Sequence, residues 1–203
     1  MTEVPLGRES PRPERADAAR NRQQLLATAR EMLAESGPDN LTMDALAERS
    51  GLGKGTVFRR FHTRAGIFQA LLDDSERDLQ EQVLGGPPPL GPGAPPIERL
   101  IAYGRARVTW LFRNRDVARF SLDGRQPMPG PTQAPASQLH ISVLLRQLNL
   151  PGVNVRLLAV QLAAALDGPL LLYLSAHTLG ANAEDAERDL GAAWQTLVER
   201  VCR

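Results

Sequence analysis

The stretch LTMDALAERSGLGKGTVFRRFHTR, residues 41–64, holds two short runs with helical periodicity that are separated by glycines. Thr42 stands one residue before the first run, where its side-chain oxygen can cap the free N–H groups of a helix start. Gly51 ends this run, because glycine adopts a left-handed backbone conformation without steric cost. The pattern predicts two short helices joined by a tight turn, a helix-turn-helix around which the rest of the chain must fold.

The second of these helices is predicted to have an apolar side and a basic side. Val57, Phe58 and Phe61 recur at helical spacing and would hold it against a core. Its other faces carry Lys54, Thr56, Arg59 and Arg60. From Arg49 to Arg64 there are five basic residues and no acidic one, although the whole chain has a formal net charge of only +1. A local excess of this kind is typical of a surface that faces phosphates.

The string SGLGKGTVFRRFHTRAGIFQALL, which extends this motif, resembles the DNA-binding signature of the tetracycline-repressor (TetR) family of bacterial regulators. The resemblance implies an all-α protein, with an N-terminal three-helix helix-turn-helix DNA-binding domain and a larger C-terminal helical domain for ligand binding and dimerisation. It also implies a homodimer that binds an inverted-repeat operator in double-stranded DNA. A small-molecule effector would release the protein from that operator. The family favours a repressor, and the residues leave a transcriptional activator open.

Seven residues with hydroxyl or cationic groups are candidates for contacts to DNA: Thr42, Lys54, Thr56, Arg59, Arg60, His62 and Arg64. Hydroxyls at the two helix starts suit phosphate oxygens, and the lysine suits guanine or phosphate. Arg59 can make a bidentate contact to guanine O6 and N7, worth about 1–3 kcal/mol of discrimination. Arg60 and His62 lie nearer the helix end and are expected to reach the DNA backbone. The resemblance implies a phosphate contact for Arg64, which opens the next helix.

Two positions depart from the family pattern. Phe58 stands where members commonly carry a tyrosine, so the ring can still pack but a hydroxyl bond to phosphate is lost. Gly53 replaces the usual small polar residue before the recognition helix, a cap that is weaker by roughly a few tenths of a kcal/mol. Both changes are expected to make DNA binding depend more on the arginines, without abolishing it.

Proline and glycine divide the chain into four segments. Residues 1–17 are rich in arginine and proline and are predicted to form a flexible arm, and residues 18–84 hold the helix-turn-helix domain with its connecting helix. Residues 85–96, GGPPPLGPGAPP, are predicted to be a loop because six prolines and four glycines exclude a helix. Residues 97–203 form the C-terminal domain. Outside the motif, periodicity predicts helices at 17–36, 63–83, 97–114, 117–122, 137–148, 154–179 and 183–203.

The last helix carries a narrow apolar seam that indicates how two chains could assemble. Leu190, Trp194, Leu197 and Val201 follow one another at offsets of 4, 3 and 4 residues, a spacing used by paired helices. With the preceding helix, this helix is predicted to dock on the same two helices of a second chain as an isologous four-helix interface. Packing of the seam within its own subunit is the alternative.

The C-terminal domain is expected to hold a pocket for a small, often apolar or aromatic effector, as the resemblance implies. Candidate pocket residues are mainly the larger or polar side chains on otherwise apolar helices: Tyr103, Arg107, Trp110, Phe120, Met128, His140, Leu144, Tyr173 and His177. The alternative for each of them is an ordinary place in the core or on the surface. The sequence does not identify the effector.

Other patterns argue against an enzyme or a membrane protein. GLGKGT does not fit an ATP phosphate loop, because Glu48 stands where the first glycine belongs and Gly55 where Ser or Thr should follow the lysine. The three histidines are scattered, so we expect no catalytic site, no metal and no cofactor. A single cysteine, Cys202, with no signal peptide and no membrane span, indicates a cytoplasmic protein. A helical small-molecule enzyme and a protein-binding adaptor with a vestigial helix-turn-helix are the alternatives.

Overall fold

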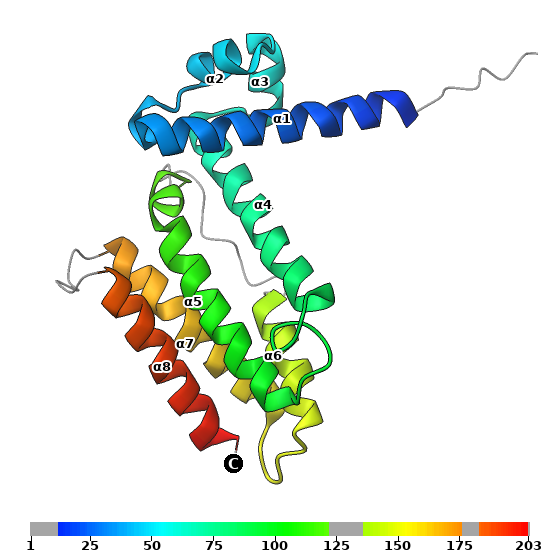
Figure 1. Ribbon diagram of the computed structural model, residues 1–203, viewed down its shortest axis with the longest axis vertical. Helices are drawn as coiled ribbons and strands as arrows, with labels where there is room; N and C mark the ends of the chain where they lie inside the picture. The colour runs from blue at the N-terminus through cyan, green and yellow to red at the C-terminus, as the bar shows by residue number, and fades with distance from the viewer. Residues whose placement is uncertain (1–11, 122–135, 176–182, 203) are drawn as a thin grey trace, which may run out of the picture. The chain divides into compact units, whose positions relative to one another are not determined.

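Helices make up the regular structure that the computed structural model describes, in residues 12–121, 136–175 and 183–202 (Figure 1). No strand occurs in these ranges, which confirms the predicted all-α class. Internal packing divides the chain into two compact units, Met1–Leu71 and Leu72–Arg203, called unit 1 and unit 2 below. The boundary falls inside a helix, whereas the sequence pattern places it in the proline-rich segment 85–96.

Unit 1 contains three helices, one short 3-10 helix and the start of a fourth helix: α1 (Arg12–Ser36), η1 (Pro38–Asn40), α2 (Met43–Ser50), α3 (Lys54–Phe61) and α4 (Arg64–Gly85). α1 packs against α2 and η1, and α2 packs against α3. The core consists of buried apolar side chains, chiefly Leu25, Leu26, Leu41, Leu46, Val57, Phe61, Ile67 and Phe68. This core supports the helix-turn-helix, α2 and α3, that the sequence predicts.

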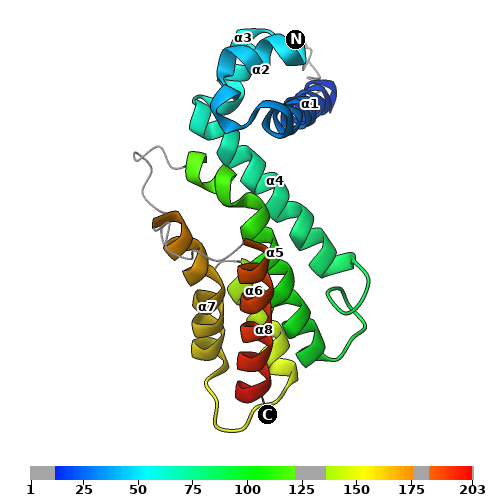
Figure 2. The ribbon, with the colours of Figure 1, turned by 60° about the vertical axis from the view of Figure 1, so that its left-hand side comes forward.

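Unit 2 holds the rest of α4 and four further helices: α5 (Pro96–Ser121), α6 (Ala136–Gln147), α7 (Val155–Ser175) and α8 (Ala183–Val201). α5 is the central helix, because α6, α7 and α8 all pack on it (Figure 1 and Figure 2). Its core includes Leu100, Val108, Ile141, Leu144, Leu162 and Val198. No described helix combines the length and the apolar composition needed to cross a membrane.

Two helix starts and one helix end differ from the bounds that the sequence pattern predicts. α1 begins at Arg12, inside the segment 1–17 that is predicted to be an arm. α5 continues unbroken to Ser121, because the residues that follow Asn114 include neither glycine nor proline. α6 begins at Ala136, so Ser137 lies inside the helix and is buried. Backbone hydrogen bonds decide where a helix ends, and a side-chain pattern places that end only to within a few residues.

Trp194 belongs to the core of unit 2, which corrects its prediction as a dimer contact. Its side chain is 4% exposed, and its Nε1 donates a hydrogen bond to the carbonyl oxygen of Leu100 at 3.1 Å. The indole lies against Gly104, where an added Cβ would stand 1.9 Å from Nε1. Trp194 is therefore used to join α8 to α5 of its own chain.

The other three residues of the predicted seam differ in how far they are buried in unit 2. Leu190 packs against the same core and Val201 is half-buried, whereas Leu197 is 37% exposed. An apolar spacing of 4, 3 and 4 residues serves helix pairing within a chain as well as between chains. Periodicity alone could not distinguish the two. Trp194 and Leu190 pack within their own subunit, and a dimer contact of Leu197 and Val201 stays a prediction.

Candidate nucleic-acid interface and ligand pocket

The turn between α2 and α3 has the geometry that the sequence predicts. Thr42 Oγ1 accepts a hydrogen bond from the backbone N–H of Ala45 at 3.1 Å and so caps the start of α2. Gly51 follows α2 with φ of 69°, a left-handed conformation that favours glycine. α3 begins after Gly53 without a side-chain cap, and residues 53–55 are exposed. The positive end of the α3 dipole therefore faces the surface, where an anion could approach it.

α3 buries one face and exposes the others. Val57 is 1% and Phe61 is 4% exposed, as expected for residues that hold α3 to the core. Phe58 is 61% exposed, which corrects the prediction that it packs with them. It follows Val57 by one residue, which is about 100° around a helix of 3.6 residues per turn. Phe58 therefore lies at the edge of the face that carries Val57 and Phe61, and its ring is on the solvent side of that edge.

Acidic residues on neighbouring helices offset part of the positive charge predicted for this surface. Arg49 donates two hydrogen bonds to the carboxylate of Glu35, at 2.5 and 2.6 Å, and Lys54 Nζ lies 2.7 Å from Asp44 Oδ1. The hydrogen bond from Arg49 lowers the pKa of Glu35, and the hydrogen bond to Asp44 raises the pKa of Lys54. Both acids precede the basic run 49–64, so a charge count within that run does not include them.

Arg64 is engaged inside unit 1. Its Nε donates to the carbonyl oxygen of Leu41 at 2.8 Å, and its Nη2 donates to that of Pro38 at 2.6 Å. Its guanidinium carbon also lies 5.2 Å from the centre of the Phe68 ring. Arg64 thus holds the start of α4 to the segment before α2, an internal role that the predicted phosphate contact did not include.

Arg60 and His62 are exposed near the end of α3. Arg60 Nη2 donates to the carbonyl oxygen of Ala18 on α1 at 2.7 Å, so this arginine links two helices of unit 1. His62 ends α3 with φ of 61°, a backbone conformation that residues other than glycine seldom adopt. Both side chains remain at the surface.

Arg59 is exposed, and within the described part of the chain no hydrogen bond or ion pair engages its guanidinium. It lines a surface hollow that α2 and α3 form together. The other lining residues are Met43, Asp44, Gly53, Lys54, Gly55, Thr56 and Phe58. An unengaged guanidinium, a lysine, a threonine hydroxyl and an exposed aromatic ring are thus grouped on one side of the helix-turn-helix.

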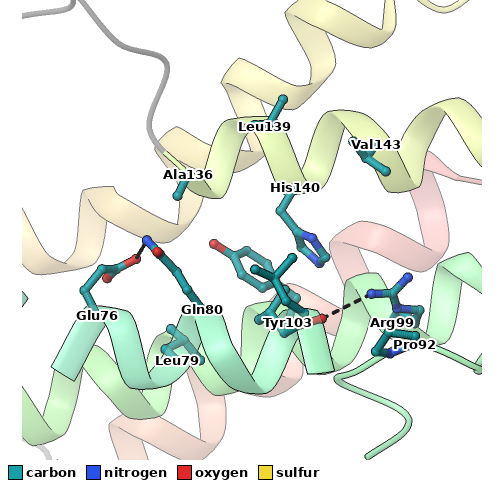
Figure 3. A pocket seen from close by; sticks show the side chains of 12 residues that line it. Glu76, Leu79, Gln80, Pro92, Arg99, Tyr103, Ala136, Leu139, His140 and Val143 are labelled. Atoms are coloured by element: carbon teal, nitrogen blue, oxygen red, sulfur yellow. Dashed lines mark hydrogen bonds between the residues drawn. The ribbon is translucent and has the colours of Figure 1, made fainter. Parts of the chain in front are cut away.

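Unit 2 contains a cavity of about 380 Å³, lined by α4, α5, α6 and the segment between α4 and α5 (Figure 3). Most of its lining side chains are apolar and a few are polar: Glu76, Leu79, Gln80, Val83, Leu84, Pro92, Arg99, Tyr103, Ala136, Leu139, His140 and Val143. Five of these residues belong to α4. Mostly apolar walls with a small number of polar groups are typical of a small-molecule site.

Tyr103 and His140 are the predicted pocket residues that line this cavity. Their ring centroids lie 4.8 Å apart at an interplanar angle of 51°. Leu144 is fully buried in the core instead, and Phe120 lies half-buried near the end of α5, away from the lining. Two further candidates, Met128 and His177, lie outside the described residues, as does the side chain of Tyr173.

Arg107 and Trp110 form a charged cluster beside the cavity rather than part of its wall. Arg107 forms an ion pair with Glu76, its Nη2 lies 3.6 Å from Asp167 Oδ1, and its guanidinium carbon lies 4.3 Å from the centre of the Trp110 ring. Glu76 is half-buried, although the pattern of α4 favours a solvated position, because Arg107 compensates its charge. Burial raises the pKa of Asp167, against the opposing effect of Arg107.

Arg99 is the main polar residue of the cavity that sequence reasoning missed. Its Nη2 donates a long hydrogen bond, 3.4 Å, to the carbonyl oxygen of Val83. In the sequence it stands beside Glu98 at the start of a helix, where charged residues are common on the surface. Its position one residue before the buried Leu100 was the available signal, and it was a weak one.

Two polar atoms of the cavity residues are buried and have no hydrogen-bond partner among the described residues: Nε of Arg99 and Nε2 of His140. Burial, and then the positive charge of Arg99, lower the pKa of His140 from 6.5 to about 4. The imidazole is therefore neutral at pH 7. Because buried polar groups are nearly always partnered in native proteins, this end of the cavity lacks an acceptor that a ligand can supply.

Comparison with known proteins agrees with this architecture. Residues 25–71 match the family described as bacterial regulatory proteins, tetR family. An HTH-type transcriptional regulator of Staphylococcus aureus strain USA300 is 32% identical over 65 residues, which are 32% of this chain and 34% of that protein. The match thus spans about a third of the length of that relative.

Solved structures extend the likeness to both units. A protein of Mesorhizobium loti described as a TetR-family transcriptional regulator aligns with a TM-score of 0.60 at 18% identity, over 91% of this chain and 97% of that chain. TetR from Acinetobacter baumannii aligns with a TM-score of 0.53 at 20% identity, over 88% and 92%. At these identities the structural likeness establishes the fold. The helix-turn-helix domain is thus similar in sequence to the tetR family of bacterial regulatory proteins, and the helical fold of the chain is similar to that of solved TetR-family regulators.

Proposed function

We propose that this chain is a cytoplasmic DNA-binding repressor that binds an inverted-repeat operator as a homodimer and is released by a small-molecule effector. The observation that carries the proposal is Arg59, exposed on the outer face of α3 and unengaged by the described residues. Around it lie the other groups that a short helix needs in the major groove, and behind it Val57 and Phe61 attach α3 to the core.

α3 is the element suited to reading bases. Its outer face presents a guanidinium, which can donate two parallel hydrogen bonds to O6 and N7 of guanine. The exposed ring of Phe58 offers an apolar surface for a thymine methyl group or a deoxyribose. Phe58 lacks the hydroxyl of the tyrosine that is common in the family at this position. Its ring would therefore contact DNA through carbon atoms, where a tyrosine would bond to phosphate.

Phosphate contacts would orient the helix. Thr42 Oγ1 accepts from Ala45 N–H, and its own O–H can still donate to a phosphate, because a hydroxyl has one donor and two acceptor positions. Thr56 and the exposed start of α3 line the surface hollow that also holds Arg59. Lys54 can exchange its exposed partner Asp44 for a phosphate, and Arg60 can exchange the Ala18 carbonyl in the same way. Arg64 instead keeps the helix-turn-helix in position.

The outward faces of α7 and α8 are the surface proposed for dimerisation. Leu157 and Val160, three residues apart on α7, are 59% and 43% exposed, and Leu197 on α8 is 37% exposed. Large apolar side chains that stay exposed on these two helices are candidates for a protein–protein contact. They replace Trp194, whose ring is buried against α5, in the four-helix interface implied by the resemblance.

Effector control is proposed to act through α4. Five residues of α4 line the cavity of unit 2, and the same helix begins at Arg64 in unit 1. A ligand that packs on Leu79 and Val83 changes the position of α4 only if α4 has two arrangements and the ligand binds one arrangement more tightly than the other. In a dimer that reads two half-sites ~34–36 Å apart, a small change in the spacing of the recognition helices costs much affinity.

The test is binding of the purified protein to DNA that flanks its own gene, at low and moderate salt, followed by footprinting. We expect protection of an inverted repeat, steep weakening with salt, and loss of protection in Arg59→Ala. Arg113→Ala is the matched control, because Arg113 is an exposed arginine on α5 outside unit 1. Equal binding of Arg59→Ala and the parent on DNA fragments selected from the whole genome would contradict the proposal. In vitro transcription from the protected promoter then separates a repressor from an activator.

A further inference from the structure

Polar side chains lie at both ends of the cavity of unit 2, but the charge is compensated at only one of them (Figure 3). Arg99 and His140 lie together at one end, while Glu76 and Gln80 lie at the other, with Tyr103 between them. Glu76 is already ion-paired with Arg107. Arg99 has no acidic partner among the described residues, and its one hydrogen bond goes to the Val83 carbonyl. The cavity therefore carries one uncompensated positive charge, placed at the Arg99 end.

The hydrogen-bonding capacity at this end is also incomplete. Nε of Arg99 always carries a hydrogen and can only donate, and it is buried without a partner in the described chain. Nε2 of His140 is buried without a partner as well, and in the neutral ring one tautomer makes it a donor. A single anionic group with two acceptor oxygens would satisfy both nitrogens and the charge. A buried cation and donor left without partners are otherwise costly.

The remaining walls are suited to an apolar body. Leu84, Leu139 and Val143 line the cavity and are 74%, 62% and 41% exposed, which is unusual for large apolar side chains on one site. Leu79 and Val83 form its buried floor on α4. A ligand with a hydrocarbon or aromatic portion would remove these side chains from water, at about 25 cal/mol per Å² of apolar area.

From this arrangement we infer that the effector is a small amphiphilic carboxylate. Its carboxylate accepts hydrogen bonds from the Arg99 guanidinium and from His140 Nε2–H, and its apolar part covers Leu84, Leu139 and Val143. The cavity volume of about 380 Å³ is near the lower end of the range of about 300–1,000 Å³ for ligand pockets, so the ligand is compact. The inference rests on the proposed function, because it names the chemical class of the effector assumed there.

The experiment is isothermal titration calorimetry on the full chain at pH 7.5, without DNA. The probes form two series of equal shape and different charge: octanoate, octanamide and octylamine, and 4-phenylbutyrate with its amide and amine. The first series tests an aliphatic body and the second an aromatic one. In the better series we expect the carboxylate to bind on the order of tenfold or more tightly than the amide, as a charge-assisted hydrogen bond provides. The amine is expected to bind weakest.

Arg99→Gln is the diagnostic variant. It should lower the affinity for the carboxylate on the order of tenfold or more, to that of the amide, and leave the affinity for the amide nearly unchanged. Arg113→Gln makes the same charge change on the exposed face of α5 and should bind every probe as the parent does. His140→Phe keeps a ring beside Tyr103 and removes Nε2, so it should weaken carboxylate binding by a smaller factor. Circular dichroism verifies that both cavity variants are folded.

Several outcomes would overturn the inference. One is equal or tighter binding of the amides or amines by the parent protein. Another is a carboxylate preference that persists in both folded cavity variants. A third is the absence of saturable binding of either carboxylate at millimolar concentration.

Footprinting of the same preparations separates this inference from the proposed function. A protein that protects an inverted repeat but shows no carboxylate preference retains the proposed function and excludes this effector class. A protein that binds a carboxylate through Arg99 but protects no DNA retains the site and contradicts the regulator.

Discussion

Unit 1 and unit 2 differ in how far their polar side chains have hydrogen-bond partners within the chain. In unit 1 the cations of the helix-turn-helix mostly have internal partners, with Arg49 on Glu35, Arg60 on a carbonyl of α1 and Arg64 on two carbonyls. Among the described residues, all the buried side-chain polar atoms that lack a hydrogen-bond partner lie in unit 2: Nε of Arg99, Nε of Arg107, Nε1 of Trp110 and Nε2 of His140.

The difference indicates how each unit meets its ligand. Internal hydrogen bonds in unit 1 hold α2 and α3 in position before DNA arrives, which reduces the ordering cost of binding. Unit 2 instead leaves buried donors unsatisfied near its cavity, and a ligand that supplies acceptors removes that cost. A preorganised surface and an incompletely satisfied cavity are therefore combined in one chain.

The largest expected effect tests whether α8 uses Trp194 inside unit 2. Trp194→Ala removes a buried indole and its hydrogen bond to Leu100, and we expect it to lower the free energy of unfolding by about 3–5 kcal/mol. Leu197→Ala, on the same helix but 37% exposed, should change that stability far less. Urea unfolding followed by circular dichroism gives both values. Normal stability of Trp194→Ala together with a loss of dimer in sedimentation would restore the seam as an interface between chains.

The next largest effect distinguishes Arg64, which makes hydrogen bonds inside unit 1, from Arg59, which is proposed to contact bases. Arg64→Ala leaves the carbonyl oxygens of Leu41 and Pro38 without their donor, which we expect to cost about 1–3 kcal/mol for each partly buried group. Arg59→Ala should leave the stability of unit 1 unchanged, because its side chain is exposed and unengaged by described residues. Thermal unfolding of the two variants measures the contrast. Equal stability of both variants would show that the Arg64 bonds contribute little.

Arg59→Ala should act on DNA binding instead. We expect a loss of about 1–3 kcal/mol in the preference for the operator over a fragment with its guanine replaced. Fluorescence anisotropy with both fragments at one salt concentration provides the measurement, and Arg113→Ala is again the control. A uniform loss on both fragments would mean that Arg59 contacts a phosphate rather than a base.

Acid should weaken unit 2 through His140. Its pKa in the folded protein, about 4, lies below the ordinary value of 6.5, so below pH 6.5 the unfolded chain binds the proton more readily. Stability from this group is therefore present above pH 6.5 and is lost as the pH falls toward 4. His140→Phe should show a shallower decline than the parent in unfolding experiments across this window. Parallel declines in the two proteins would assign the acid sensitivity to other groups, such as the carboxylates.

The smallest expected effect concerns the exposed pair of Lys54 and Asp44. Asp44→Asn removes a negative charge beside α3 and frees Lys54 Nζ, which lies 2.7 Å from it. Operator binding should become slightly tighter, because Lys54 no longer has to leave Asp44 to reach a phosphate, and the slope of its salt dependence should stay the same. Anisotropy titrations over a salt series measure the slope, with Asp116→Asn on α5 as a control of equal charge change. A slope steeper by about one phosphate contact would indicate that Asp44 keeps Lys54 away from phosphate in the parent complex.

Much of unit 1 could be predicted because its signals are local. The Thr42 cap, the left-handed Gly51 and the burial of Val57 and Phe61 each depend on residues within a few positions of one another. Phe58 was misplaced because it stands at the edge of the apolar face of α3, where helical spacing does not decide whether a side chain is buried or exposed. In unit 2, the helices were predictable from periodicity, whereas the bounds of α5 and α6 depended on backbone hydrogen bonds.

The pocket could be predicted only in part, since Tyr103 and His140 line it while Arg107 and Trp110 stand beside it. Arg99 and Glu76 look like surface charges in sequence, and their burial depends on helices far away along the chain. The partners of Arg49 and Lys54 were missed for the same reason.

By itself, the sequence determined the all-helical class, the helix-turn-helix and its resemblance to the tetR family, because these follow from residue order over short distances. Only the tertiary structure decided which cations are engaged, which side of α8 is buried and where unpartnered donors meet an apolar cavity. Burial and charge compensation are properties of packed neighbours, and packing brings together residues as distant as Leu100 and Trp194.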